Sequence, residues 1–138
     1  MITIEEGLRY YLSNYAGLVS LISTRVHPMR IPQGATIPCL TYQRISTPRL
    51  NTHDVSGATG TAHPRFQFDA WAATYDSAKD ITDQVRAALQ GYKGSMGTGG
   101  TAVTVQAVLS ADERPEFNPE TGLYRISSDY IIWHLEAL

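Results

Sequence analysis

The sequence contains a single cysteine, Cys39, among its 138 residues. An intramolecular disulfide is therefore excluded, and a chain of this kind is typical of a reducing compartment. The hydrophobic core has to suffice without cross-links, and a chain of this length buries roughly 68% of its unfolded surface, which is enough. Because Cys39 follows Pro38 at the start of a predicted strand, we expect it to be a small buried hydrophobic residue.

The chain also has no excess of positively charged residues. Eleven Lys and Arg residues and thirteen Asp and Glu residues give a formal net charge of -2 at pH 7. Without an overall positive field the chain has nothing to hold a polyanion non-specifically, so general binding of DNA or RNA is not expected.

Long apolar runs are missing as well. No uninterrupted run approaches the ~18 residues of a membrane span, and the amino-terminal MITIEEGLRYYL has acids where a signal peptide carries positive charge. We therefore expect a soluble protein that is not exported and has no membrane segment. The length fits a single domain over residues 1–138.

The sequence lacks the usual motifs of metal-binding and phosphate-binding sites. The four histidines, at 27, 53, 63 and 134, show no HExxH or His-x-His spacing. The run GSMGTGGT at 94–101 follows a predicted helix and lacks a GK[ST] lysine, so we expect residues 91–101 to form a flexible connection. We expect no catalytic residue, metal or cofactor, and a small enzyme that uses Cys39 or His134 stays open as an alternative.

Apolar residues at helical spacing predict two main helices. Thr3 and Glu6 form a capping box, which predicts a helix over about residues 3–14. A shorter amphipathic turn follows near residues 18–22. The second main helix begins among residues 74–77, and Gly91 is placed to end it. Its apolar stripe consists of Ala78, Ile81, Val85, Ala88 and Leu89.

Alternation of apolar and polar residues predicts four strands. The first two cover residues 39–46 and 64–73. The third has Val103, Val105, Ala107 and Leu109 on one face, and the fourth has Tyr124, Ile126, Tyr130 and Ile132 on one face. Between the first two strands lies a loop at 47–61 that has few apolar residues. Loops of this length are uncommon in a domain and are typical of functional or mobile segments.

The order of these elements predicts an α+β domain. We expect a mainly antiparallel sheet of about four strands with the two main helices packed on one face. The opposite face mixes opposite charges with tryptophans, which are enriched together with arginine at protein contacts. We interpret this face as a protein interface, with an ordinary solvated face as the alternative. Its candidate residues are Arg65, Asp69, Trp71, Arg125, Asp129 and Trp133.

Four acids cluster in the predicted turn at 110–121. They are Asp112, Glu113, Glu116 and Glu120. Charged residues of this kind keep an exposed hairpin soluble, which is the interpretation we favour. Contact with a basic partner surface is the alternative.

Two stretches of the sequence resemble a known family when they are taken together. They are RIPQGATIPCLTYQRIS at 30–46 and RFQFDAWAATYDSAKDITDQVRAAL at 65–89. Their residues, order and spacing resemble the small tail-completion, or tail-terminator, proteins of long-tailed bacteriophages and prophages. The resemblance covers most of the chain and departs from the family pattern at 47–61 and 91–101.

This resemblance implies a structural protein of the virion tail that has no catalytic activity and is assembled in the host cytoplasm. Such proteins form a ring, expected to be a hexamer, on the head-proximal end of the tail tube and stop its polymerisation. The implied partners are sister copies, the major tail tube protein and a head-completion, or connector, protein. DNA passes through the lumen without sequence-specific binding, and no membrane is involved.

Two regions are expected to make these contacts. The mixed sheet face would bind a sister copy or a tube subunit, because a closed ring requires head-to-tail contacts between different surfaces. The 47–61 loop, especially Arg49, His53 and Asp54, would become ordered on meeting the tube or the adjacent subunit. Another head–tail neck component, such as a head-closure or minor tail protein, and a small-molecule-binding module with an apolar pocket are the alternatives.

Overall fold

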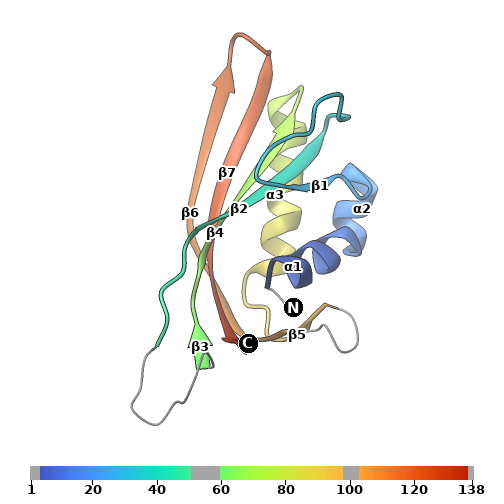
Figure 1. Cartoon of the computed structure of the whole chain (residues 1–138). Coiled ribbons are helices and arrows are strands. Elements are labelled where there is room, and N and C mark those ends of the chain that lie inside the picture. Colours follow the sequence, from blue (N-terminus) through green and yellow to red (C-terminus); the bar gives the residue numbers. More distant parts are fainter. Residues whose placement is uncertain (1–3, 51–59, 98–102, 137–138) are drawn as a thin grey trace.

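A seven-stranded sheet with helices against one side makes up the computed structural model, which describes residues 4–50, 60–97 and 103–136. Figure 1 shows α3 lying along the sheet and the β6–β7 hairpin extending away from the helices. The helices are α1 (Ile4–Ser13), α2 (Ala16–Ile22) and α3 (Tyr75–Leu89). The strands are β1 (Val26–Pro28), β2 (Cys39–Ser46), β3 (Gly60–Ala62), β4 (Arg65–Ala72), β5 (Gly94–Met96), β6 (Val103–Asn118) and β7 (Leu123–Glu136).

The strand order is β1-β2-β4-β7-β6-β5, and β3 pairs separately with β7. The β1–β2 pair is parallel, and every other pair is antiparallel. The α+β class is confirmed, whereas the expected number of about four strands is wrong. The additional strands β1, β3 and β5 have three residues each, which is too short for alternation to reveal them in a sequence.

Helix α3 forms as its sequence predicts. The Thr74 hydroxyl accepts the backbone N–H of Ser77 at 3.2 Å, and two residues after the helix ends, Gly91 adopts a φ of +79°. Glycine reaches this left-handed conformation without steric cost, so the chain turns there toward β5. The predicted cap at Thr3 lies outside the described residues.

The core lies between the helices and the sheet. Helix α1 contributes Leu8 and Leu12, α3 contributes Ile81, and the central strand β4 contributes Phe66 and Phe68, all fully buried. Burying each such side chain stabilises the fold by about 1.5–3 kcal/mol. This packing fixes one face of the sheet against the helices and leaves the other face without cover from the described elements.

Strand β6 departs from the regular alternation that its sequence suggests. Its register against β7 shifts between Val105 and Ala107, and again between Ser110 and Asp112. A bulge inserts an extra residue, so the side chains that follow change faces. Val105 is buried, but Leu109 is 53% exposed, and Val108 enters the core instead. The prediction that Val103, Val105, Ala107 and Leu109 share one face is therefore wrong beyond the first bulge.

Candidate functional site: the outer face of the sheet

The face of the sheet turned away from the helices, called the outer face below, brings together the side chains singled out in the sequence. In the β4–β7 register, Asp69 lies opposite Ser127 and Trp71 opposite Arg125. Cross-strand partners in a sheet point to the same side, so the two strands build one continuous surface. The outer face comprises Arg65, Gln67, Asp69 and Trp71 of β4 and Arg125, Ser127, Asp129, Ile131 and Trp133 of β7.

Asp129 is the centre of an ionic cluster on this face. Its Oδ2 atom accepts hydrogen bonds from Arg65 Nε at 3.0 Å and Arg65 Nη2 at 2.8 Å. Its Oδ1 atom lies 3.4 Å from Arg114 Nη2, and the residue is 4% exposed. A buried carboxylate requires partners of this kind, because an uncompensated buried charge costs several kcal/mol. The long arginine side chains therefore cover the acid and hold β4, β7 and β6 together.

Asp69 is also buried, at 7% exposure, and is satisfied by neutral donors. Ser127 Oγ donates to its Oδ1 atom at 2.6 Å, and Gln67 Nε2 donates to both carboxylate oxygens at 2.9 and 3.2 Å. Hydrogen bonds to an ionised carboxylate are stronger than neutral ones. The carboxylates of the outer face are thus already engaged within the chain and are not free to bind a ligand.

Trp71 is half-buried at the hairpin end of the outer face. Its Nε1 atom donates to Thr41 Oγ1 at 3.0 Å, and the Arg125 guanidinium lies 5.4 Å from the centre of its ring. Arg125 also pairs with Glu116. A cavity of about 310 Å³ lies beside this stack and is lined by Trp71, Glu116, Phe117, Asn118, Pro119 and Arg125.

Trp133 lies at the other end of the face, eight residues along β7 from Arg125. At the spacing of a strand this is roughly 26 Å from the Trp71 end, so the two tryptophans do not form one cluster. The Trp133 ring stacks on His63 at 4.2 Å between centroids and an angle of 13°. Leu109, opposite Ile131, and Leu135 are exposed beside it. Leu109, Ile131, Trp133 and Leu135 form what we call the apolar end of the outer face.

Sequence reasoning did not include Leu109 and Leu135 among the candidates. The bulge in β6 turns Leu109 outward, and nothing in the local sequence reveals a bulge. The outward position of Leu135 follows from the alternation along β7, which continues two residues beyond Trp133, the last candidate residue of this face. If the alternating pattern had been followed two residues further along the strand, it would have identified Leu135.

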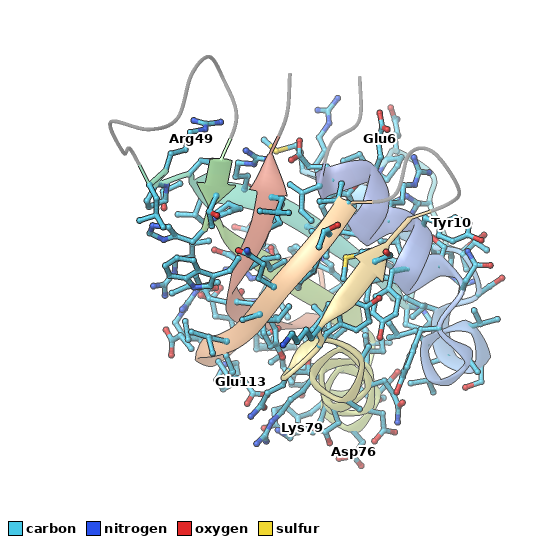
Figure 2. All side chains as sticks on the ribbon, turned by 90° about the horizontal axis from the view of Figure 1, so that it is seen from below. Glu6, Tyr10, Arg49, Asp76, Lys79 and Glu113 are labelled. Carbon is cyan, nitrogen blue, oxygen red and sulfur yellow. The ribbon has the colours of Figure 1, made fainter. Side chains whose placement is uncertain are left out.

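The expected loop at 47–61 is shorter than predicted because its base is paired. Arg49 forms an isolated antiparallel bridge with Ala62, and the Leu50 N–H donates to the Thr61 carbonyl at 3.0 Å. The first two residues of strand β3 fall within the expected loop. Figure 2 places Arg49 at the border of the molecule, near β3. The other two candidate loop residues, His53 and Asp54, lie outside the described residues.

The acidic cluster of the hairpin is exposed and paired. Lys79 Nζ lies 3.2 Å from Glu113 Oε1, and Glu116 pairs with Arg125. Asp112 pairs with Arg114, whose hydrogen bond lowers the pKa of that carboxyl. Exposed ion pairs contribute little to stability, so these acids can exchange partners at small cost.

The two residues named for the enzyme alternative, Cys39 and His134, lie apart in the fold. Cys39 is fully buried, and burial raises the pKa of its thiol to about 11, so the thiolate is scarce at neutral pH. His134 is buried near the opposite end of the sheet, on β7 beside β3. Within residues 4–50, 60–97 and 103–136, no group of three His, Cys, Asp or Glu side chains is arranged to hold a metal ion. No helix of the same ranges is long and apolar enough to cross a membrane.

Comparison with known proteins identifies relatives of this architecture. A family model described as tail completion protein gp17 matches residues 6–135. Among solved structures, a chain of the virion of a native gene transfer agent (GTA) particle has a similar fold, with a TM-score of 0.65. The identity is 17%, over 91% of this chain and 90% of that one, so this likeness concerns the fold alone. No curated protein matches the chain.

Proposed function

Because the chain belongs to the tail completion protein gp17 family, whose members are structural phage tail proteins and not enzymes, we propose that it is a tail terminator. It forms a ring at the head-proximal end of the tail tube and stops polymerisation of the tube. The ring also joins the tail to the head through a head-completion protein, and DNA passes through its lumen. It is thus a component of the virion tail, assembled in the host cytoplasm.

The chemistry of the outer face is the main support for this proposal. Its carboxylates are buried and satisfied by Arg65, Arg114, Gln67 and Ser127, so a partner that covers the face meets no unpaired buried charge. The apolar end offers exposed leucines for burial, each worth about 1.5–3 kcal/mol when fully covered. A surface of this kind binds another protein surface, either a sister copy or the terminal subunit of the tail tube.

The similar fold in a gene transfer agent virion supports this assignment, since that chain is part of an assembled particle. Arg49, which bridges Ala62, lies at the same end of the sheet as the apolar end of the outer face. We include Arg49, His53 and Asp54 in the contact with the tube or the adjacent subunit.

Tail length measured by electron microscopy tests the proposal. Particles that lack this protein should have tails of uncontrolled length that are not joined to heads, and the wild-type chain should restore both properties. A Leu109→Asp variant should fold but fail to restore them, because it places a charge on the apolar end. The matched control is Val19→Asp on α2, an exposed apolar residue on the helical side, which should restore normal tails.

Two results would count against this function. Normal tail length in particles without the protein would contradict a terminator. Labelled protein that binds to isolated heads and not to tube ends would assign the chain instead to another component of the head–tail neck. Deletion of residues 49–59 tests the loop separately, since normal joined tails would remove it from the interface.

A further inference from the structure

Charge is unevenly distributed along this chain. Residues 7–53 contain five arginines and no Asp or Glu, whereas residues 54–138 contain eleven acids and six Lys or Arg residues. The net charge of -2 conceals this segregation. The two parts supply opposite sides of the sheet, because β1 and β2 come from the first part and β6 and β7 from the second.

One side of the sheet carries a basic edge, which we define as Arg9, Arg25, His27 and Arg30. His27 lies on β1, the first strand in the sheet order, and Arg30 lies two residues after the end of that strand. Helix α1, which carries Arg9, contacts β1, and burial together with the charges of Arg9 and Arg25 lowers the pKa of His27. Arg9 and Arg30 are exposed. Within the described ranges none of the three arginines forms an ion pair, and Arg25 Nε donates instead to the Pro38 carbonyl.

The other side carries an acidic edge, which we define as Asp112, Glu113, Glu116 and Glu120. Strand β5 pairs with β6 only along Val103–Val105, and the Gly91 N–H bonds to the Val108 carbonyl. From Leu109 to Asn118, no described strand pairs with the side of β6 that faces away from β7. Figure 2 shows Glu113 beside Lys79 at this border of the molecule.

We propose that the acidic edge of one copy binds the basic edge of the next copy. The inference rests on the proposed function in one respect, that the assembly is a closed ring. Four strand spacings, roughly 19 Å, separate β1 from β6, so each subunit presents its two different surfaces on opposite sides. Repetition of such a head-to-tail contact closes into a ring when the rotation permits it. The outer face then remains available to the tail tube.

The contact is made by side chains and not by strand pairing. Pro115 interrupts the free edge of β6, and charged side chains there oppose the addition of a further strand. Arginine suits the opposing surface, because its planar guanidinium binds a carboxylate through two hydrogen bonds. Opposite charges also speed association. Two copies in the wrong orientation would bring like charges together and repel each other, so all copies in the ring face the same direction.

Charge reversal at each edge tests the inference. An acid-reversed variant carries Glu116→Lys and Glu120→Lys, and a base-reversed variant carries Arg9→Glu and Arg30→Glu. Two controls change charge elsewhere: Asp76→Lys with Asp80→Lys on α3, and Gln90→Glu with Lys93→Glu after its carboxyl end, where both residues are exposed. Circular dichroism establishes that each variant is folded, and native mass spectrometry with sedimentation velocity at low and high salt reports the assembly state.

The wild-type chain and both controls should assemble at low salt, and assembly should weaken as salt screens the contact. Each edge variant alone should show a dissociation constant raised by at least about tenfold, because it presents like charges to itself. An equimolar mixture of the two edge variants should assemble again, as should a chain that carries all four substitutions. In the mixture the two variants have to alternate, so only rings with an even number of subunits close.

The outcomes separate this inference from the proposed function. If the wild-type chain assembles and both edge variants assemble equally well, another surface joins the copies, and the ring survives while the inference fails. If the wild-type chain stays monomeric at every salt and protein concentration tested, both the edge contact and self-assembly into a ring are overturned. Restored assembly in the mixture, by contrast, would show that the acidic edge of one copy contacts the basic edge of another.

Discussion

Substitution of Arg65 gives the sharpest test of how the outer face is held together. Arg65→Met keeps the aliphatic part of the side chain but removes both hydrogen bonds to Asp129 Oδ2. The Asp129 side chain, 6% exposed, then retains only Arg114 at 3.4 Å. Removing one partner of a buried ion pair costs about 3–5 kcal/mol, and the remaining arginine places this case near the lower value, about 3 kcal/mol.

Two further variants show whether burial is the cause. Arg125→Met breaks the pair with Glu116, whose side chain is 53% exposed, and should cost only about 1 kcal/mol, including the contact with the Trp71 ring. Asp129→Asn removes the buried charge itself and leaves an Arg65 side chain that is 38% exposed and can turn to water. It should therefore cost less than Arg65→Met, and the double variant should recover part of the loss.

Equilibrium unfolding in urea measures these differences, with the free energy of unfolding obtained by linear extrapolation. In a thermal scan the Arg65→Met loss should lower the Tm by roughly 10 °C for a domain of this size. Equal losses for Arg65→Met and Arg125→Met would refute the reasoning, because they would show that the burial of Asp129 does not set the cost. A double variant less stable than Arg65→Met would refute it in a second way.

Three further predictions concern other parts of the fold. Gly7→Ala should destabilise the protein despite the higher helix propensity of alanine, measurable in urea, because the added Cβ would lie 2.7 Å from the backbone oxygen of Met96. Cys39 should react with iodoacetamide at least roughly 100-fold more slowly in the folded protein than in urea, since burial raises the pKa of its thiol from 9.0 to about 11. Folding lowers the pKa of His27 below the 6.5 of the unfolded chain, so its contribution to stability is present above about pH 6.5 and is lost as the pH falls below that value. Unfolding of His27→Gln should accordingly show a smaller loss of stability on acidification than unfolding of the wild type.

The helices α1 and α3 and the strands β4 and β7 could be predicted from the sequence because each satisfies its own periodicity. Alternation along β4 and β7 placed Asp69 and Asp129 on the same face, and their register confirms it. Short strands and bulges could not be predicted, since they depend on a partner strand and not on a local pattern. The exposure of Leu109 is a direct result of such a bulge.

The burial of Asp69 and Asp129 on the outer face also could not be predicted from local sequence patterns. Alternation places Asp69 and Asp129 on the face away from the helices, where exposure is the ordinary expectation, yet both are buried. Long neighbouring side chains cover them, and this coverage depends on which residues the register places opposite. The segregation of charge is different, because the acid-free stretch 7–53 is visible in the sequence itself. Only the strand order shows that the two kinds of charge lie on opposite edges of one sheet.

The edge contact and the outer face meet at Glu116. Its carboxylate belongs to the acidic edge, and it pairs with Arg125, whose guanidinium lies over the Trp71 ring. Because an exposed ion pair contributes little free energy, an arginine of a neighbouring copy can replace Arg125 at Glu116 at small cost. Arg125 would then keep only its contact with the ring, which leaves a positive charge beside the cavity of about 310 Å³. The proposed contact between copies would therefore alter the charge of the surface that we propose for the tail tube, and it would physically link the two steps of assembly.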